Sequence, residues 1–228
     1  MNIKRFSISQ IAVHAVAAAS ILLLYFTGLP MTFPEQLGWI PAILGGYEVT
    51  MFIHRIAAIC LIVSGIYFVI HYLLNGILVR KSLSTGIFPK IQDVLDAIND
   101  TLRLFRLPLG KDQIPKFGKY TWIAKFEFWS IFFEGGIFII TGIILWFPFQ
   151  FMAVMPKDYI AVAKIIHAGF AIISICGVSF HSYMVHFNPA RFRIDRSVFS
   201  GEMPEEEAKE MHPKWYEEIK GGEHVQNT

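Results

Sequence analysis

The chain has 228 residues, of which 54% are hydrophobic and 21 are phenylalanine, and its mean hydropathy is +0.48. These values are high for a water-soluble domain and indicate a membrane protein. The 20 basic and 18 acidic residues nearly cancel, so the net charge gives no reason to expect nucleic acid or an acidic substrate as a partner.

Four stretches are apolar and long enough to cross a bilayer, whose hydrocarbon core takes about 20 residues of helix. They predict an all-α fold, a membrane-spanning four-helix bundle formed by residues 1–190, with residues 191–228 as a cytoplasmic C-terminal tail. Such a chain is a multi-pass protein of the cell inner (plasma) membrane. The predicted helices cover about 11–29, 50–79, 122–147 and 159–187.

The distribution of Lys and Arg predicts the orientation, because these residues accumulate on the cytoplasmic side of a membrane. Lys4 and Arg5 precede the first helix, and basic residues are frequent between the second and third helices and just after the fourth. The connection 30–49 contains none, and the connection 148–158 contains only Lys157. Both termini are therefore expected in the cytoplasm.

The long inner connection contains an amphipathic segment at about 90–106. In IQDVLDAINDTLRLF, apolar residues recur at helical spacing and charged residues occupy the other faces. The pattern predicts a helix that lies on the inner membrane surface. A solvated cytoplasmic helix that packs on a partner fits the pattern equally well.

Four histidines lie inside the predicted helices, at two depths. His167 and His181 are fourteen residues apart, which on a helix is roughly 21 Å of rise and within about 40° of the same face. Because the fourth helix runs inward, His167 lies in the outer half of the bilayer and His181 in the inner half. His54 is near the outer end of the second helix, and His14 is near the inner end of the first.

This arrangement suits two six-coordinate b-type haems, each held by imidazoles from two helices. His54 with His167 would hold an outer haem, and His14 with His181 an inner one. A polar side chain in hydrocarbon is costly unless it has a partner, so an intramembrane histidine is a candidate functional residue. The alternative for any single histidine is a structural hydrogen bond between helices, and the matched depths of the four favour ligation.

Two cations stand beside the predicted outer haem. Arg55 directly follows His54, and Lys164 lies one turn before His167. Both could pair with haem propionates, because an Arg inside a bilayer needs an anionic partner. Lys164 could instead extend its amine toward the headgroups without any cofactor role.

The other polar groups have less specific assignments. His71 and His186 fall off the shared faces and are assigned interfacial or quinone-adjacent roles, while His212 and His224 in the tail are expected to be solvated. Glu134 could relay protons or be a structural carboxyl. No internal repeat is apparent, and the chain has no CxxCH, zinc-type or nucleotide-binding motif.

Several segments of the chain are similar to those of a known family. They are RFSISQIAVHAVAAASILLLYFTGLP (5–30), FIHR (52–55), KFGKY (116–120), TGIILWFP (141–148) and HPKWYEE (212–218), together with the spacing of His167 and His181. On these features the chain resembles the gamma subunit of membrane-bound formate dehydrogenases, within the wider group of four-helix dihaem b-type cytochromes that also serve hydrogenases. The tail segment favours the formate dehydrogenase branch.

The resemblance implies an electron-transfer subunit of a respiratory oxidoreductase complex, distinct from the catalytic subunit. It implies the ligand pairs given above, His54 with His167 and His14 with His181. Electrons would pass from an iron-sulfur subunit on the outer face, which joins the catalytic subunit, through the outer and inner haem b. The acceptor would be a membrane quinone, menaquinone or ubiquinone, bound near the cytoplasmic face.

The chain departs from the family pattern at the expected quinone pocket. Family members typically continue GKY with Asn-Ala-Gly-Gln before a Lys, whereas this chain reads Thr121, Trp122, Ile123 and Ala124 before Lys125. The amide side chains are therefore missing. Tyr120 and Thr121 are the candidates for hydroxyl contacts with the quinone.

Other functions fit part of the pattern. The donor could be a hydrogenase or another iron-sulfur oxidoreductase instead of formate dehydrogenase. A haem-free transporter could use the membrane histidines and Glu134 to bind ions or relay protons. A structural anchor that has lost its redox function is a third possibility.

Overall fold

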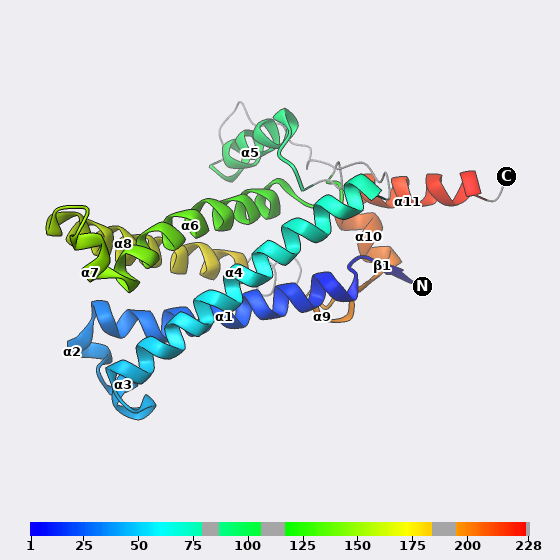
Figure 1. The fold of residues 1–228 in the computed structure, drawn as a ribbon. Helices are drawn as coiled ribbons and strands as arrows, with labels where there is room; N and C mark the ends of the chain where they lie inside the picture. Colours follow the sequence, from blue (N-terminus) through cyan, green and yellow to red (C-terminus); the bar gives the residue numbers. More distant parts are fainter. Residues whose placement is uncertain (79–86, 106–116, 184–194, 227–228) are drawn as a thin grey trace. The chain divides into compact units, whose positions relative to one another are not determined.

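The computed structural model describes residues 1–78, 87–105, 117–183 and 195–226, and these are almost entirely helical (Figure 1). The predicted ends of the second helix at 79, of the amphipathic segment at 106 and of the fourth helix at 187 lie outside these residues, as does His186. The elements in chain order are β1 (Asn2–Lys4), α1 (Ile8–Thr32), α2 (Pro34–Leu37), α3 (Trp39–Leu44), α4 (Tyr47–Leu78), α5 (Ile91–Leu104), α6 (Trp122–Trp146), α7 (Pro148–Met152), α8 (Lys157–Ser182), α9 (Ser197–Ser200), β2 (Glu202–Pro204), α10 (Glu205–Met211) and α11 (Pro213–Gln226).

Four helices, α1, α4, α6 and α8, are long and apolar enough to cross a membrane. Their candidate spans hold 25 or 26 residues with mean hydropathies of 1.9 to 2.1. At about 1.5 Å per residue, 25 residues extend roughly 38 Å, which exceeds the roughly 30 Å of the hydrocarbon core. The predicted all-α, four-helix membrane fold is therefore confirmed.

The contacts within the chain divide it into two compact units. One unit comprises residues 9–69 and 130–194, which include His14, His54, His167 and His181. The other comprises residues 1–8, 70–129 and 195–228. The tail that we expected to stand apart thus shares a unit with the N-terminal residues and with α5.

The second unit is built on a strand pair that the sequence did not predict. β1 and β2 run antiparallel, with Ile3 opposite Met203 at the centre of the register. Met203, Ala208 and Trp215 form a buried cluster against which Ile3 and other partly buried side chains pack. The first residues of the chain are therefore attached to its tail by backbone hydrogen bonds and by apolar contacts.

His212 belongs to this unit and is buried, with 1% of its surface exposed, so the expectation that it is solvated is wrong. Its Nδ1 lies 2.7 Å from the carbonyl oxygen of Gly118, which can only accept, so Nδ1 carries the proton. Its Nε2 is then free to accept a hydrogen bond from Nη2 of Arg5, 3.1 Å away. His212 is therefore a neutral bridge between the tail and two distant segments of the chain.

Arg5 is also the partner of a buried carboxylate. Its Nη1 lies 2.8 Å from Oδ2 of Asp195 and donates a second hydrogen bond to Oγ of Ser197. Burial alone would raise the pKa of Asp195, but the Arg5 guanidinium and the hydrogen bonds from Ser197 outweigh it and hold the pKa below its ordinary value of 3.8. Asp195 is therefore ionised at neutral pH.

Candidate cofactor site between the spanning helices

His54 of α4 and His167 of α8 come together in the first unit. Their rings are 6.4 Å apart between centroids and are inclined by 58°. Two imidazoles that flank one metal ion, each with its nitrogen about 2 Å from the metal and its ring centre about 1 Å further away, have centroids roughly 6 Å apart. The two side chains are therefore spaced to hold a single metal ion between them.

The proton on His54 is placed by Thr27 of α1. Oγ1 of Thr27 lies 2.9 Å from Nδ1 of His54 and 2.7 Å from the carbonyl oxygen of Leu23. The hydroxyl has one proton, and the carbonyl can only accept it, so the Thr27 oxygen accepts the hydrogen bond from His54. His54 therefore carries its proton on Nδ1 and has its lone pair on Nε2, the form in which imidazole binds a metal.

Thr141 of α6 does the same for His167. Its Oγ1 lies 2.8 Å from Nδ1 of His167 and donates to the carbonyl oxygen of Ile137 at 2.7 Å. Both threonines are buried. Each histidine of this pair thus has its tautomer and its ring orientation set by a neighbouring helix, which is how ligand histidines are commonly oriented.

A glycine follows each threonine and lies against the same imidazole. A Cβ built on Gly28 would lie 3.0 Å from Cε1 of His54, which is closer than ordinary contact. A Cβ built on Gly142 would lie 3.5 Å from Cε1 of His167, an ordinary contact distance. The His54 ring therefore needs the glycine beside it, whereas the His167 ring has more room.

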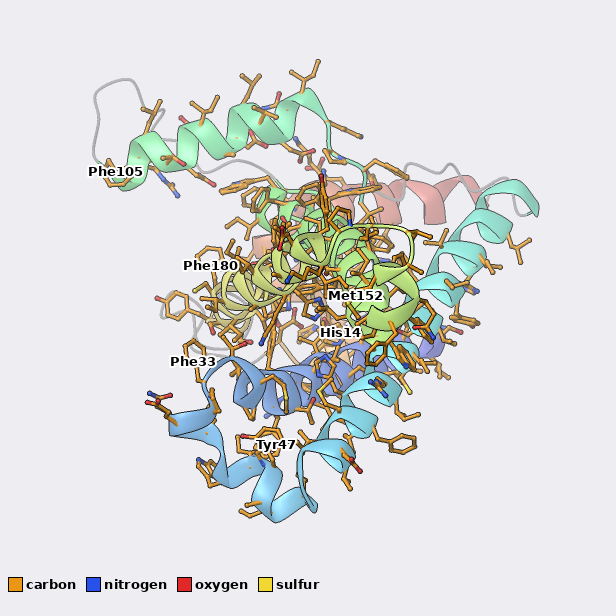
Figure 2. All side chains as sticks on the ribbon, turned by 60° about the vertical axis from the view of Figure 1, so that its left-hand side comes forward. His14, Phe33, Tyr47, Phe105, Met152 and Phe180 are labelled. Carbon is orange, nitrogen blue, oxygen red and sulfur yellow. The ribbon has the colours of Figure 1, made fainter. Side chains whose placement is uncertain are left out.

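The two Thr-Gly pairs belong to an internal repeat, which corrects the expectation that the chain has none. TGLPMTFP (27–34) and TGIILWFP (141–148) share Thr, Gly, Phe and Pro at the same spacing. In each copy the Phe precedes a short helix that begins at the Pro, with φ and ψ of −123° and 63° at Phe33 and −119° and 52° at Phe147. Figure 2 shows Phe33 at the turn between α1 and α2.

The same repeat relates the ligand candidates. His54 follows its threonine by 27 residues, and His167 follows its own by 26. A helix that carries Thr-Gly is thus followed, in both halves of the bundle, by a helix that carries the histidine. The similarity of the two short sequences can be found in the sequence alone. It is obscured by Pro30, which stands in the first copy where the second has Ile144.

The two cations that were predicted beside this pair have different surroundings. Arg55 is half-buried, and its guanidinium lies 5.1 Å from the ring centroid of Trp146, a contact that the sequence did not predict. Lys164 is exposed. Phe138 places its ring edge against His167, with centroids 5.1 Å apart, and closes that side of the imidazole.

The predicted inner ligands lie on α1 and α8. His14 is the seventh residue of α1 and is exposed, and His181 is the last but one of α8 and is half-buried. Their pairing around an inner haem stays a prediction.

The two predicted quinone contacts lie in the other unit. Thr121 stands directly before α6, and its Oγ1 accepts a hydrogen bond from the backbone nitrogen of Ala124 at 3.2 Å. Its hydroxyl therefore acts as a helix cap. The Tyr120 ring lies 6.4 Å from that of Phe6 and 5.7 Å from the Lys119 amine.

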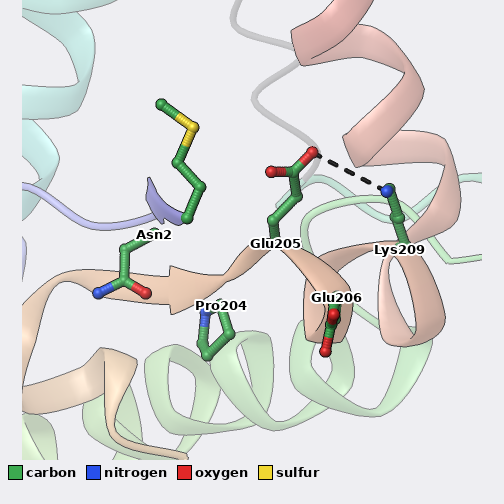
Figure 3. Close-up of a pocket in the computed structure, with 6 residues that line it drawn as sticks. Asn2, Pro204, Glu205, Glu206 and Lys209 are labelled. Carbon is green, nitrogen blue, oxygen red and sulfur yellow. Dashed lines mark ion pairs between the residues drawn. The ribbon is translucent and has the colours of Figure 1, made fainter.

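Two of the cavities in the described part of the chain differ in their lining. An apolar one of about 270 Å³ is lined by α1 and α4, including Leu23 and Ala57. A polar one of about 370 Å³ lies beside β2 and α10, where Glu205 and Lys209 form an ion pair (Figure 3). Neither cavity includes a residue of the histidine pair.

Four membrane-crossing helices with paired imidazoles from two of them define the class of b-type cytochromes. The profile described as prokaryotic cytochrome b561 matches residues 5–201. The chain belongs to this family. It is therefore a haem b protein and a multi-pass protein of the inner membrane, as its sequence predicts.

Curated relatives cover nearly the whole chain at low identity. The nitrate-inducible formate dehydrogenase cytochrome b556(Fdn) subunit of Escherichia coli K12 is 23% identical over 212 residues, which are 93% of this chain and 89% of the relative. The formate dehydrogenase cytochrome b556 subunit of Haemophilus influenzae is 23% identical over 90% of this chain and 78% of its own length. The cytochrome b556(fdo) subunit of Escherichia coli K12 is 21% identical over 96% and 94%.

Proposed function

We propose that the chain is the membrane subunit of a formate dehydrogenase complex, and that it conducts electrons from an outer iron-sulfur subunit to membrane quinone, with two haem b groups as one-electron carriers. The observation that carries this proposal is the His54–His167 pair, in which two threonines bond both Nδ1 atoms and leave each Nε2 available to bind a metal. The names of the relatives support formate dehydrogenase over hydrogenase as the donor.

In this proposal, the residues of the outer site have distinct tasks. His54 and His167 would hold the outer haem. Thr27 and Thr141 orient the imidazoles and keep the Nδ1 proton in place, so that Nε2 is the nitrogen that would bind the iron. Arg55 is the candidate partner of a haem propionate, with Trp146 as a platform for its guanidinium, and Lys164 is a second candidate.

The inner site is proposed from the pairing of His14 with His181. His181 lies on the same helix as His167, and fourteen residues of α8 extend roughly 21 Å, so the two sites would stand at different depths of the bilayer. Quinone, either menaquinone or ubiquinone, would be reduced near the cytoplasmic face, for which Tyr120 and Thr121 are the candidate contacts. Because Thr121 already caps α6, Tyr120 is the better candidate of the two.

The orientation predicted from the basic residues would carry charge across the membrane. Electrons that enter at the outer face and reach a quinone that takes its protons from the cytoplasm move negative charge inward. Each elementary charge moved across 100 mV requires about 2.3 kcal/mol. The potential difference between the donor and the quinone would have to supply this energy.

The test is a redox spectrum of the complex purified from membranes. Formate should reduce the b-type haem of the wild-type complex, and His54→Leu and His167→Leu should each lose about half of the haem. His71→Leu changes another histidine of α4 and should keep both haems. Full haem content in His54→Leu would contradict the ligand assignment, whereas reduction by hydrogen and not by formate would contradict the choice of donor.

A further inference from the structure

The amphipathic helix α5 exposes its apolar side chains. Ile91, Val94, Leu95, Ile98 and the residue that caps its end, Phe105, are between 51% and 83% exposed, and we call them the apolar stripe of α5. At about 100° per residue they fall within an arc of roughly 100°. Phe105 stands at the end of α5 (Figure 2).

The opposite face of α5 binds the start of α6 through acidic side chains. Both carboxylate oxygens of Asp93 accept hydrogen bonds from Nζ of Lys125, at 2.7 and 2.8 Å, and Oδ2 of Asp100 accepts one from Nε1 of Trp122 at 2.8 Å. A helix on the surface of a water-soluble protein would instead pack its apolar face against the protein and expose its acidic face to water. The polarity of α5 is therefore inverted with respect to its own unit.

The contacts between α5 and α6 place the stripe at membrane depth. Just before α5, the carbonyl of Ile87 accepts a hydrogen bond from Nε1 of Trp129, and the Phe88 ring lies 5.4 Å from the Trp129 ring. Asp93 then contacts residue 125 and Asp100 contacts residue 122. The segment 87–100 therefore follows α6 back toward its first residue.

Trp129 is seven residues, or roughly 10 Å, inside the candidate span that begins at Trp122. This span is only a few ångströms longer at each end than the hydrocarbon core, so Trp129 and the start of α5 lie below the membrane surface. Phe126, which lies between Trp122 and Trp129 on α6, is 68% exposed. An exposed apolar side chain at this depth of a candidate span suits contact with lipid, as the stripe does.

Lys125 gives a second reason to place α5 in the membrane. It is 7% exposed and lies inside the candidate span, where an unpaired cation is costly. Asp93 neutralises it and also accepts a hydrogen bond from the backbone nitrogen of Lys90 at 2.6 Å, at the start of α5. The same carboxylate therefore caps the N-terminus of α5 and binds α5 to α6.

We propose that α5 is embedded in the lipid bilayer, with its apolar stripe against the acyl chains and with the Asp93–Lys125 pair as its anchor. None of the stripe residues is charged, and the cation Arg103, near the end of α5 that lies closest to the first residue of α6, suits anionic headgroups. The proposal resolves the choice between a membrane helix and a partner-binding helix in favour of the membrane. It does not depend on the haem ligands or on the electron donor.

The test measures which medium touches each face of α5. The full chain, with Cys60 and Cys176 replaced by Ser, is reconstituted in vesicles of phosphatidylethanolamine and phosphatidylglycerol. Val94→Cys and Ile98→Cys carry a nitroxide label on the stripe, and Arg103→Cys carries it at an exposed polar position near the other end of the same helix. Collisions with oxygen, which concentrates in lipid, are compared with collisions with a water-soluble nickel complex.

The expected ratio of oxygen to nickel collisions is several-fold higher at Val94 and Ile98 than at Arg103. Equal access of the nickel complex to all three positions would overturn the proposal, because the stripe would then face water. Exclusion of both agents from Val94 and Ile98 would overturn it too, because a second copy of the chain would then cover the stripe. Either result leaves the haem spectrum, and with it the proposed function, untouched.

A pair of matched variants tests the anchor. Asp93→Asn removes the charge that pairs with Lys125, and it should lower the collision ratio at Ile98 toward that of Arg103. Asp96→Asn makes the same change on the same helix, at a side chain that bonds Gln92 and not α6, and it should leave the ratio unchanged. An unchanged ratio in Asp93→Asn would overturn the role of the ion pair.

Discussion

Thr27 and His54 lie on different membrane helices and share a 2.9 Å hydrogen bond, and the Thr27 hydroxyl also donates to the Leu23 carbonyl at 2.7 Å. Because the threonine proton is engaged in the hydrogen bond to that carbonyl, the imidazole is the donor to the threonine oxygen. The same relationship joins Thr141 to His167. The two helices that carry threonine therefore set the tautomer and the ring orientation of the two histidines.

Replacing Thr27 by Val should weaken haem binding at the outer site. Val has nearly the same shape but cannot accept the hydrogen bond, so His54 loses its orientation and its fixed tautomer. Loss of such a partner typically lowers metal affinity about 10- to 100-fold. Haem content and the midpoint potential of the outer haem measure the effect.

Thr50→Val is the control for this substitution. Thr50 is equally buried and also bonds the carbonyl four residues earlier, but that carbonyl of Gly46 is its only described partner. The control should retain both haems at unchanged potentials. A Thr27→Val protein that does the same would show that the hydroxyl has no part in holding the ligand.

Gly28→Ala should disturb the outer site more than Gly142→Ala. The new methyl group would lie 3.0 Å from the His54 ring in the first variant and 3.5 Å from the His167 ring in the second. Overpacking of this kind costs about 1 to 3 kcal/mol. Haem loss on gentle heating should therefore occur earlier in Gly28→Ala, and equal loss in the two variants would contradict the geometry.

Asp195→Asn should loosen the attachment of the N-terminal strand. Removing one partner of a buried ion pair costs about 3 kcal/mol, because the Arg5 charge is left uncompensated. Hydrogen exchange of residues 1–8, followed by mass spectrometry, should speed up in this variant. Glu210→Gln, which changes an exposed acid of α10, should leave that exchange unchanged.

The same ion pair predicts an acid dependence. The pKa of Asp195 is lower in the folded chain than its ordinary value of 3.8, so the unfolded form binds the proton more readily. The pair therefore contributes its full stability above about pH 5 and loses it as the pH falls through 3.8 and then through the folded pKa. Exchange of residues 1–8 should accelerate more steeply with acid in the wild type than in Asp195→Asn, after correction for the intrinsic rate.

His212→Phe should destabilise the unit that contains the tail. Phe fills the site but leaves the Gly118 carbonyl and the Arg5 guanidinium without their bonds, and each buried unsatisfied group costs about 1 to 3 kcal/mol. Limited proteolysis of the tail should become faster while the haem spectrum is unchanged. A solvated histidine would tolerate this change, so an unaltered cleavage rate would contradict the burial of His212.

The membrane helices were predictable because each is a continuous apolar run whose length matches a bilayer. The histidine pairs were predicted from depth and helical period, and the structure places the rings of His54 and His167 6.4 Å apart, whereas their ligation of haem stays a prediction. The partners of these histidines were not predictable in the same way. A threonine inside an apolar helix carries no sign of which neighbouring helix its hydroxyl will reach.

The second unit was harder to predict for a different reason. β1 and β2 are three residues long and some 200 residues apart, so neither gives a periodic signal. His212 is buried by Arg5 and Gly118, which are distant in sequence. For α5 the period correctly indicates two faces, but only the partners of Asp93 and Asp100 reveal which face binds the protein.

The arrangement of the two threonines has a consequence for how the protein matures. Metal ligands usually shed protons as they bind, which makes loading depend on the acidity of the surroundings. Here the hydroxyls of Thr27 and Thr141 determine during folding which nitrogen of each imidazole carries the proton, so the tautomer and orientation of both candidate ligands are set before a cofactor arrives. Assembly at the outer site should therefore proceed in the fixed order of folding first and cofactor second.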